Sequence, residues 1–285
     1  MQELEDLAFL KNEIGGTIPD VLTTNMTSLR RIILQANQFS GTLPNDFLST
    51  SPLEILVLGN NRLTGLLPKN LGNETTLTQL VLERNQFEGD LPDEWGNYTQ
   101  LQTIALSSNA LNGTIPESWY HNLVNLQRLY VNGNSELYGN ISSSIGDLHS
   151  LTSLRLGNSS MGGPIPDQLY ELINLQELNL QGASFGGTLS SQIFILKSSL
   201  QDLYLNNNMF TGSIPSALET LTSLSKCFCF LVFCSFLCFV CRRVVGGEIV
   251  IWTGIVLTHG PLCFSFFFLL LFFVCVVVSW LVLMT

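Results

Sequence analysis

The spacing of leucines constrains the fold of this 285-residue chain more than any other feature. One sequence motif recurs every 24 or 25 residues, and it begins at Leu4, Leu29, Leu53, Leu77, Leu101, Leu126, Leu151, Leu175 and Leu200. A clear copy reads Leu101-x-x-Ile104-x-Leu106-x-x-Asn109-x-Leu111-x-Gly113-x-Ile115-Pro116. A unit this small cannot bury its own aliphatic row, so it becomes stable only when neighbouring units stack and share a core.

Each position of the motif has a physical role. The alternation of Leu101, Ile104 and Leu106 predicts a short strand with these side chains on its inner face. An amide at the ninth position can bond backbone groups where the strand turns, and it occurs at Asn12, Asn37, Asn61, Asn85, Asn109, Asn134 and Asn208. Ser159 and Ala183 replace this amide, which predicts a less regular solenoid from about 134 to 190.

These residues resemble the plant-type leucine-rich repeat, and the resemblance covers residues 4–224. It implies an α/β fold class, a right-handed curved solenoid with a parallel sheet on its concave side. Short 3-10 or irregular segments would form the convex side. Residues 1–226 are therefore predicted to be one solenoid domain of about nine repeats.

The remaining residues, 227–285, differ sharply in composition. They hold all seven cysteines, and their only charged residues are Arg242, Arg243 and Glu248. Residues 262–284 are uncharged and would span ~34 Å as a helix, enough to cross a bilayer. Residues 227–241, which precede the arginine pair, are a second candidate span, so we expect C-terminal hydrophobic membrane helices. The abrupt change also fits a segment wrongly assigned as coding.

The composition argues against several classes of function. A net charge of −10 disfavours a nucleic-acid partner. His121 and His149 have no nucleophile in a recognisable motif, and the cysteines lack a zinc-ligand spacing. Kinase motifs are absent as well. The sequence therefore predicts a protein that is not an enzyme and that needs no cofactor or metal.

Six Asn-x-Ser/Thr triplets indicate an exported glycoprotein. The candidate glycosylation sites are Asn25, Asn73, Asn97, Asn112, Asn140 and Asn158. Residues 1–6 are acidic and contain no apolar run of the kind that a signal peptide needs. We expect either that the natural start lies further upstream or that the protein is not secreted.

Outward strand positions of the concave face are the predicted binding surface. Its N-terminal half carries an apolar strip (Ile33, Ile55, Val57 and Val81), and its C-terminal half carries residue types that often anchor interfaces. The candidate contact residues are Ile33, Val57, Val81, Glu83, Arg128, Tyr130, Arg155, Asn179, Asp202 and Tyr204.

The resemblance implies a receptor-like recognition protein anchored in the plasma membrane, with its repeats extracellular. It would bind a protein, peptide or glycan on its concave face and signal through a co-receptor. The alternative hypothesis is a non-signalling interaction scaffold that faces the cytosol and is held on a membrane by its tail.

Overall fold

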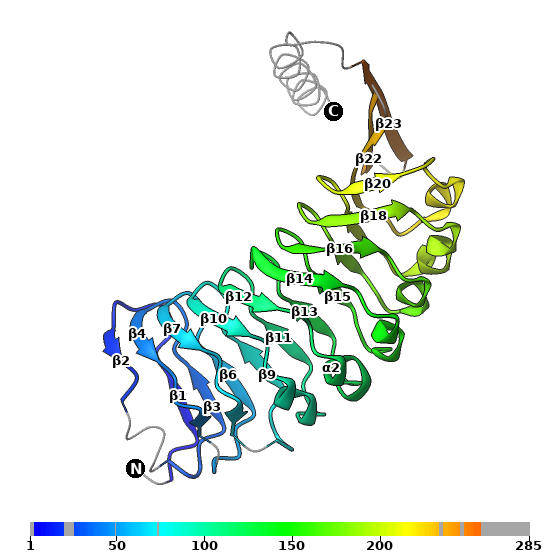
Figure 1. Ribbon diagram of the computed structural model, residues 1–285. Helices are drawn as coiled ribbons and strands as arrows, with labels where there is room; N and C mark the ends of the chain where they lie inside the picture. The colour runs from blue at the N-terminus through cyan, green and yellow to red at the C-terminus, as the bar shows by residue number, and fades with distance from the viewer. Residues whose placement is uncertain are drawn as a thin grey trace.

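The computed structural model describes residues 3–19, 26–48, 50–72, 74–233, 236–245 and 248–257, and it describes side chains as far as Cys227. Over these residues the chain winds into a curved stack of coils (Figure 1). Each of the nine predicted repeats contributes one strand to a main sheet and one strand to a second sheet. Short helices follow the outer side of the curve from the middle of the stack onwards.

The main sheet is parallel through its repeat strands, as predicted. These strands are β1 (Asp6–Ala8), β3 (Arg31–Ile33), β6 (Ile55–Val57), β9 (Gln79–Val81), β11 (Thr103–Ala105), β13 (Arg128–Tyr130), β15 (Ser153–Arg155), β17 (Glu177–Asn179) and β19 (Asp202–Tyr204). They pair without a slip, so that equivalent positions of successive repeats stand side by side. Each equivalent position therefore forms one column across the sheet.

The second sheet is also parallel and follows the ninth-position amides. It contains β2 (Gly15–Thr17), β4 (Gln38–Thr42), β7 (Arg62–Leu66), β10 (Gln86–Asp90), β12 (Ala110–Gly113), β14 (Glu136–Asn140), β16 (Ser160–Pro164), β18 (Ser184–Thr188) and β20 (Met209–Thr211). Strands β14, β16 and β18 pair in sequence, as do β13, β15 and β17 of the main sheet. The expected irregularity between 134 and 190 is therefore wrong for both sheets.

The outer side of the coils carries the short 3-10 segments that were predicted. Two early coils use a small sheet of β5 (Asp46–Phe47) and β8 (Asn70–Leu71). Later coils use η1 (Asp93–Asn97), α2 (Glu117–Asn122), η2 (Ser143–Asp147), η3 (Asp167–Glu171), η4 (Ser191–Ser198) and η5 (Ser216–Thr220). A proline precedes η1, α2, η3 and η5, where its missing N–H costs no helical hydrogen bond.

One continuous core runs along the inside of the stack. From Leu29 to Leu200 the repeat-opening leucines are 0% exposed, which confirms that they share one interior column. Near its centre the indoles of Trp95 and Trp119 stack with their centroids 5.7 Å apart. Their Nε1 atoms donate to the carbonyls of Pro68 (2.9 Å) and Pro92 (3.0 Å), so neither buried indole N–H is unpaired.

The ninth-position amides tie neighbouring coils together. Asn85 Nδ2 donates to the carbonyl of Leu82 in its own coil and to that of Leu58 in the preceding coil, both at 3.1 Å. Its Oδ1 accepts from the backbone N–H of Leu63 at 3.0 Å. Asn61, Asn109, Asn134 and Asn208 repeat the two carbonyl contacts. The predicted role of this column is confirmed.

The apolar tail differs from the expectation at its first segment. Residues 227–241 were expected to form a membrane helix, but the chain forms β21 (Lys226–Phe233), β22 (Phe236–Val245) and β23 (Glu248–Leu257). Strand β21 pairs parallel with β19, and β22 and β23 then extend the sheet antiparallel. Within the described part of the chain no helix is long and apolar enough to cross a bilayer. The second expected span, 262–284, lies outside the described residues.

The end of the solenoid explains why the first part of the tail forms strands. The free edge of β19 presents unpaired backbone groups, and the phenylalanines and valines that follow favour a strand. Strand β21 therefore continues the repeat by one more strand, and it crosses the predicted domain boundary at 226/227.

Candidate ligand-binding face

The solvent side of the main sheet collects the predicted contact residues in ordered columns. Because each repeat strand has three residues, its first and third side chains face outward and its second enters the core. The column of third positions reads Ala8, Ile33, Val57, Val81, Ala105, Tyr130, Arg155, Asn179 and Tyr204. We call this surface the main-sheet face.

The N-terminal half of the main-sheet face carries a hydrophobic cluster that is separate from the core. Val57, Val81 and Ala105 are only 7%, 9% and 4% exposed, although no second layer of the described chain covers them. Their neighbours in the sheet cover them, because adjacent strands lie about 4.8 Å apart. Ile33, Ile55 and Tyr130 pack against these three residues and stay half-buried. We call these six residues the apolar cluster.

The C-terminal half carries an ordered set of polar contacts. The Arg155 guanidinium stands 4.4 Å from the ring centroid of Tyr130. Its Nε and Nη2 atoms donate to Glu177 at 2.9 and 2.8 Å, and Ser153 Oγ donates to Glu177 Oε2 at 2.7 Å. Arg155 is therefore held in one orientation by an aromatic ring and a carboxylate.

A second ion pair lies at the C-terminal end of the main-sheet face. Lys226 Nζ donates to Asp202 Oδ2 at 3.0 Å, and this hydrogen bond raises the pKa of the Lys226 ammonium. Asp202 Oδ1 also accepts from Ser225 Oγ at 2.9 Å. Asn179 Oδ1 accepts from the backbone N–H of Gln181 at 3.1 Å.

Two predicted contact residues lie beside the apolar cluster with their charges unpaired within the described residues. Arg128 is exposed, and its Nε donates to the hydroxyl of Thr103 at 3.1 Å. Glu83 is half-buried, and its side-chain stem lies over Gly59.

Sequence reasoning found the column but missed some of its partners. Glu177, Ser153 and Lys226 complete the polar half, and Ala105 completes the apolar cluster. Glu177 and Ser153 occupy the first outward position of their strands, so the same alternation could have identified them. Lys226 could not be found this way, because the sequence pattern predicts that the solenoid ends at residue 226.

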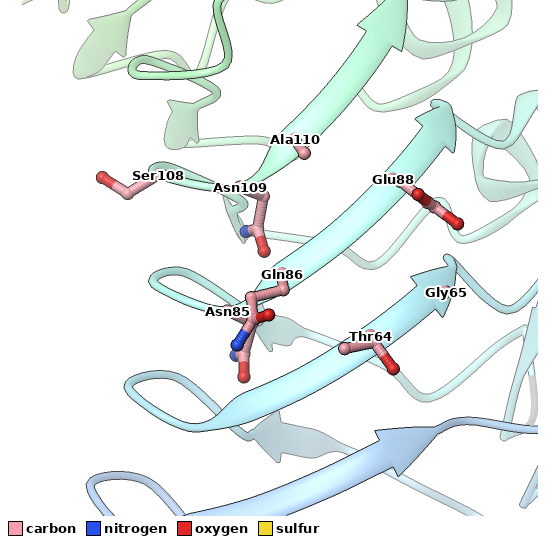
Figure 2. Close-up of a pocket in the computed structure, with 8 residues that line it drawn as sticks. All are labelled: Thr64, Gly65, Asn85, Gln86, Glu88, Ser108, Asn109 and Ala110. Atoms are coloured by element: carbon pink, nitrogen blue, oxygen red, sulfur yellow. The ribbon is translucent and has the colours of Figure 1, made fainter.

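The second sheet has a shallow, open depression between β7, β10 and β12 (Figure 2). Its volume is about 520 Å³, and it is lined by Thr64, Gly65, Asn85, Gln86, Glu88, Ser108, Asn109 and Ala110. The amides of Asn85 and Asn109 already donate to backbone carbonyls of the preceding coil. No group of three or more histidine, cysteine or acidic side chains could hold a metal ion in the part of the chain that the structure describes.

The described glycosylation candidates lie away from the main-sheet face. Asn97 is at the end of η1, Asn112 and Asn140 are in the second sheet, and Asn158 is in the loop before β16. Asn97, Asn140 and Asn158 are exposed, whereas Asn112 is half-buried. Asn25 and Asn73 fall outside the described residues.

Comparison with known proteins identifies the class of the solenoid. A family model described as Leucine Rich Repeat matches residues 52–73 and 199–221. A comparison with curated protein sequences gave no match. The two parallel sheets and the buried repeat-opening leucines extend the same repeat along the described stack. The described chain therefore forms a leucine-rich-repeat solenoid.

Solved plant receptors share this fold over most of the chain. The plant peptide hormone receptor RGFR1 in complex with RGF2 is 31% identical, covers 80% of this chain and 36% of its own, and superposes with a TM-score of 0.76. A TDR receptor is 29% identical, with 80% and 39% coverage and a TM-score of 0.74. The ectodomain of the Arabidopsis receptor kinase HAESA, in complex with an IDA peptide hormone ligand, is 27% identical, with 81% and 41% coverage and a TM-score of 0.70.

The chain thus resembles plant leucine-rich-repeat receptor ectodomains. It spans well under half the length of each of these three receptor chains.

Proposed function

We propose that this protein is a receptor-like recognition protein, anchored in the plasma membrane with its solenoid outside the cell. Its main-sheet face binds a peptide, protein or glycan partner, and it signals through a co-receptor. The observation that carries the proposal is the apolar cluster, which lies on the solvent side of a sheet beside the ordered Tyr130–Arg155–Glu177 contacts. A hydrophobic surface patch bordered by aromatic and arginine residues is typical of protein interfaces.

Two further observations support a recognition role. The similar receptors RGFR1 and HAESA were solved with peptide hormones. In addition, the described Asn-x-Ser/Thr sites lie on the second sheet, a loop and the outer side, so glycans attached there would leave the main-sheet face accessible. Two carboxylates of this face, Glu177 and Asp202, are held in ion pairs, which favours a binding surface over a catalytic one.

Binding is tested by substitutions in the polar half of the main-sheet face. We expect Tyr130→Ala and Arg155→Ala to weaken capture of the full chain on an array of synthetic peptides. Matched controls are Tyr138→Ala and Arg62→Ala, which alter exposed side chains of the second sheet. Equal loss in the controls, or no loss in either test variant, contradicts a binding role for this face.

Location is tested by glycosidase treatment of the full chain expressed in plant cells. Extracellular repeats should carry N-glycans, so treatment should increase the electrophoretic mobility. An unchanged mobility would support the alternative, a cytosol-facing interaction scaffold held on a membrane by residues 227–285.

A further inference from the structure

The depression in the second sheet lies beside Asn112, one of the candidate glycosylation sites. We propose that this depression holds the inner sugars of an N-glycan attached to Asn112, so that the glycan packs on the solenoid instead of extending freely into solvent. The inference rests on the extracellular location in the proposed function, and it extends that function to a second surface of the molecule.

Strand β12 brings the depression and the glycosylation site together. Ala110 lines the depression, and Asn112 follows it by two residues. Because Leu111 between them is buried, both side chains lie on the outward face of the second sheet, about 7 Å apart along the strand. In the neighbouring strand Glu88 pairs with Ala110 and Asp90 pairs with Asn112. A glycan on Asn112 therefore begins next to the depression.

The side-chain amide of Asn112 leaves its nitrogen available for a sugar. Its Oδ1 atom is buried and has no hydrogen-bond partner among the described residues. Its Nδ2 atom, which would carry the sugar, is also bonded to no described residue, but it stays in contact with solvent. The attachment atom therefore lies on the outward side of the sheet, where the depression is.

A small side chain creates the depression. The position after the ninth-position amide is Gln38 in β4 and Gln86 in β10, whereas β12 has Ala110 there. Together with Gly65 in β7, Ala110 leaves a space of about 520 Å³ between the larger side chains around it (Figure 2). This volume is within the range of small-ligand sites, about 300–1,000 Å³.

The chemistry of the lining suits sugar hydroxyl groups. The side chains of Thr64, Gln86 and Glu88 make no hydrogen bond or ion pair with other described residues. A threonine hydroxyl and a glutamine amide can each donate and accept, and a carboxylate accepts strongly. Sugar hydroxyls and acetamido groups also donate and accept, so they match this set. An apolar ligand would leave the same polar groups without partners, which is unfavourable.

The shallow shape of the depression favours an attached glycan over a sugar from solution. An open site removes little of a ligand's surface from water, so a free sugar would bind weakly. A glycan on Asn112 reaches the same polar groups within one molecule, at an effective concentration of the order of millimolar. Attachment therefore makes a weak site effective.

The test uses the full chain, expressed in plant cells under conditions that keep its glycans in the oligomannose form. Glycopeptide mass spectrometry first measures which sites carry a glycan. Endoglycosidase H, which cuts between the two innermost sugars, is then added to the native chain, and release is timed at each site. Asn140, exposed in β14 of the same sheet, and Asn97, exposed at the end of η1, are the internal references.

A glycan held in the depression is protected from the enzyme. We expect release at Asn112 to be about tenfold slower than at Asn140, the effect of one or two net hydrogen bonds. Ala110→Gln, which fills the depression with the side chain that β4 and β10 carry, should restore the faster rate. Met209→Gln, the same change at the equivalent position of β20, should preserve the protection.

Two acidic residues distinguish binding in the depression from general crowding around Asn112. Glu88 lines the depression, whereas Glu136 pairs with Asn112 on its other side. Glu88→Ala should speed release at Asn112 several-fold, and Glu136→Ala should leave it slow. Crowding alone predicts the opposite result for Ala110→Gln, because a larger side chain would hinder the enzyme further.

Equal rates of release at Asn112 and Asn140 overturn the inference, and so does slow release that persists in Ala110→Gln. The inference is also overturned if Asn112 carries no glycan while Asn97 or Asn140 does, although the extracellular location then stands. If no site carries a glycan, the extracellular location fails and this inference fails with it.

Discussion

At the scale of single residues, the amide at the ninth repeat position makes backbone hydrogen bonds that no aliphatic side chain could make. Asn85 is 8% exposed, and its amide pairs with backbone groups of two successive coils. Its removal would leave the carbonyls of Leu58 and Leu82 with fewer partners in the interior. Unpaired buried polar groups are costly, so this column stabilises the stack through the penalty that it avoids.

We expect Asn85→Ala to lower the free energy of unfolding by about 2 to 3 kcal/mol. The control Asn122→Ala removes an exposed amide at the end of α2. Urea unfolding followed by tryptophan fluorescence provides the measurement. A loss in Asn85→Ala no larger than that in the control would show that the amide column does not hold the coils together.

Buried tyrosines make the stability of the solenoid sensitive to alkali. Burial raises the pKa of Tyr170 to about 12, and it also raises the pKa values of Tyr98 and Tyr120. The folded chain therefore holds these protons more tightly than the unfolded chain, in which a tyrosine titrates near about 10. The resulting stability is complete below about pH 10 and is lost as the pH rises toward 12.

We accordingly expect the urea midpoint to fall as the pH rises above about 10, and to fall less steeply in Tyr170→Phe. Tyr138→Phe, at an exposed position of β14, should follow the unmodified chain. Identical pH profiles for Tyr170→Phe and the unmodified chain would remove Tyr170 as a source of the alkaline loss.

At the scale of elements, a glycine with a positive φ recurs in every strand of the second sheet from β2 to β18, and several of these glycines lie close to the preceding coil. Gly65 in β7 has a φ of +79°, and a Cβ atom there would come within 2.8 Å of Thr42 Cγ2 in the preceding coil. Gly187 in β18 has the same φ of +79°, but a Cβ atom there would stay 3.6 Å from Pro164. The two positions therefore separate backbone strain from crowding.

Both Gly65→Ala and Gly187→Ala should destabilise the solenoid, because a left-handed backbone costs an alanine about 1 to 2 kcal/mol. Gly65→Ala should lose more, since its methyl group also meets Thr42. Chemical unfolding of the two variants gives the comparison. An equal loss of unfolding free energy in the two variants would mean that the contact with Thr42 is relieved at no cost. The destabilisation would then come from the backbone conformation alone.

The strands were predictable because their pattern is local, whereas the contacts between them were not. The alternation around Leu80 shows that Val81 faces outward, but not that its neighbours in the sheet cover it until it is only 9% exposed. The partner of Arg155 likewise depends on which strand lies beside it, and Glu177 is 22 residues away. Hydrophobicity alone could not predict whether residues 227–241 form a strand or a membrane helix, because the same apolar side chains are compatible with both.

At the scale of the whole molecule, the coils share one core but not one environment. Leu80, in the interior of the stack, is 0% exposed, whereas the equivalent Leu7 of the first coil is only half-buried. In a stacked solenoid each coil contacts only its neighbours, so stability is a sum of coil terms and interface terms. The effect of one substitution therefore depends on how many neighbours its coil has.

We expect Leu80→Ala to cost about 3 to 4 kcal/mol, since it leaves a cavity that coils on both sides line. The same change at Leu7 should cost much less, because the first coil has a described neighbour on one side only and its leucine is already half in water. Trp95 and Trp119 report from coils near the centre, so their fluorescence transition should shift to lower urea in Leu80→Ala and stay in place in Leu7→Ala. Equal shifts in the two variants would mean that the whole solenoid unfolds as one unit and that a coil at the end stabilises the centre as strongly as an interior one. The contrast between the two leucines thus measures how far stability is transmitted along the stack.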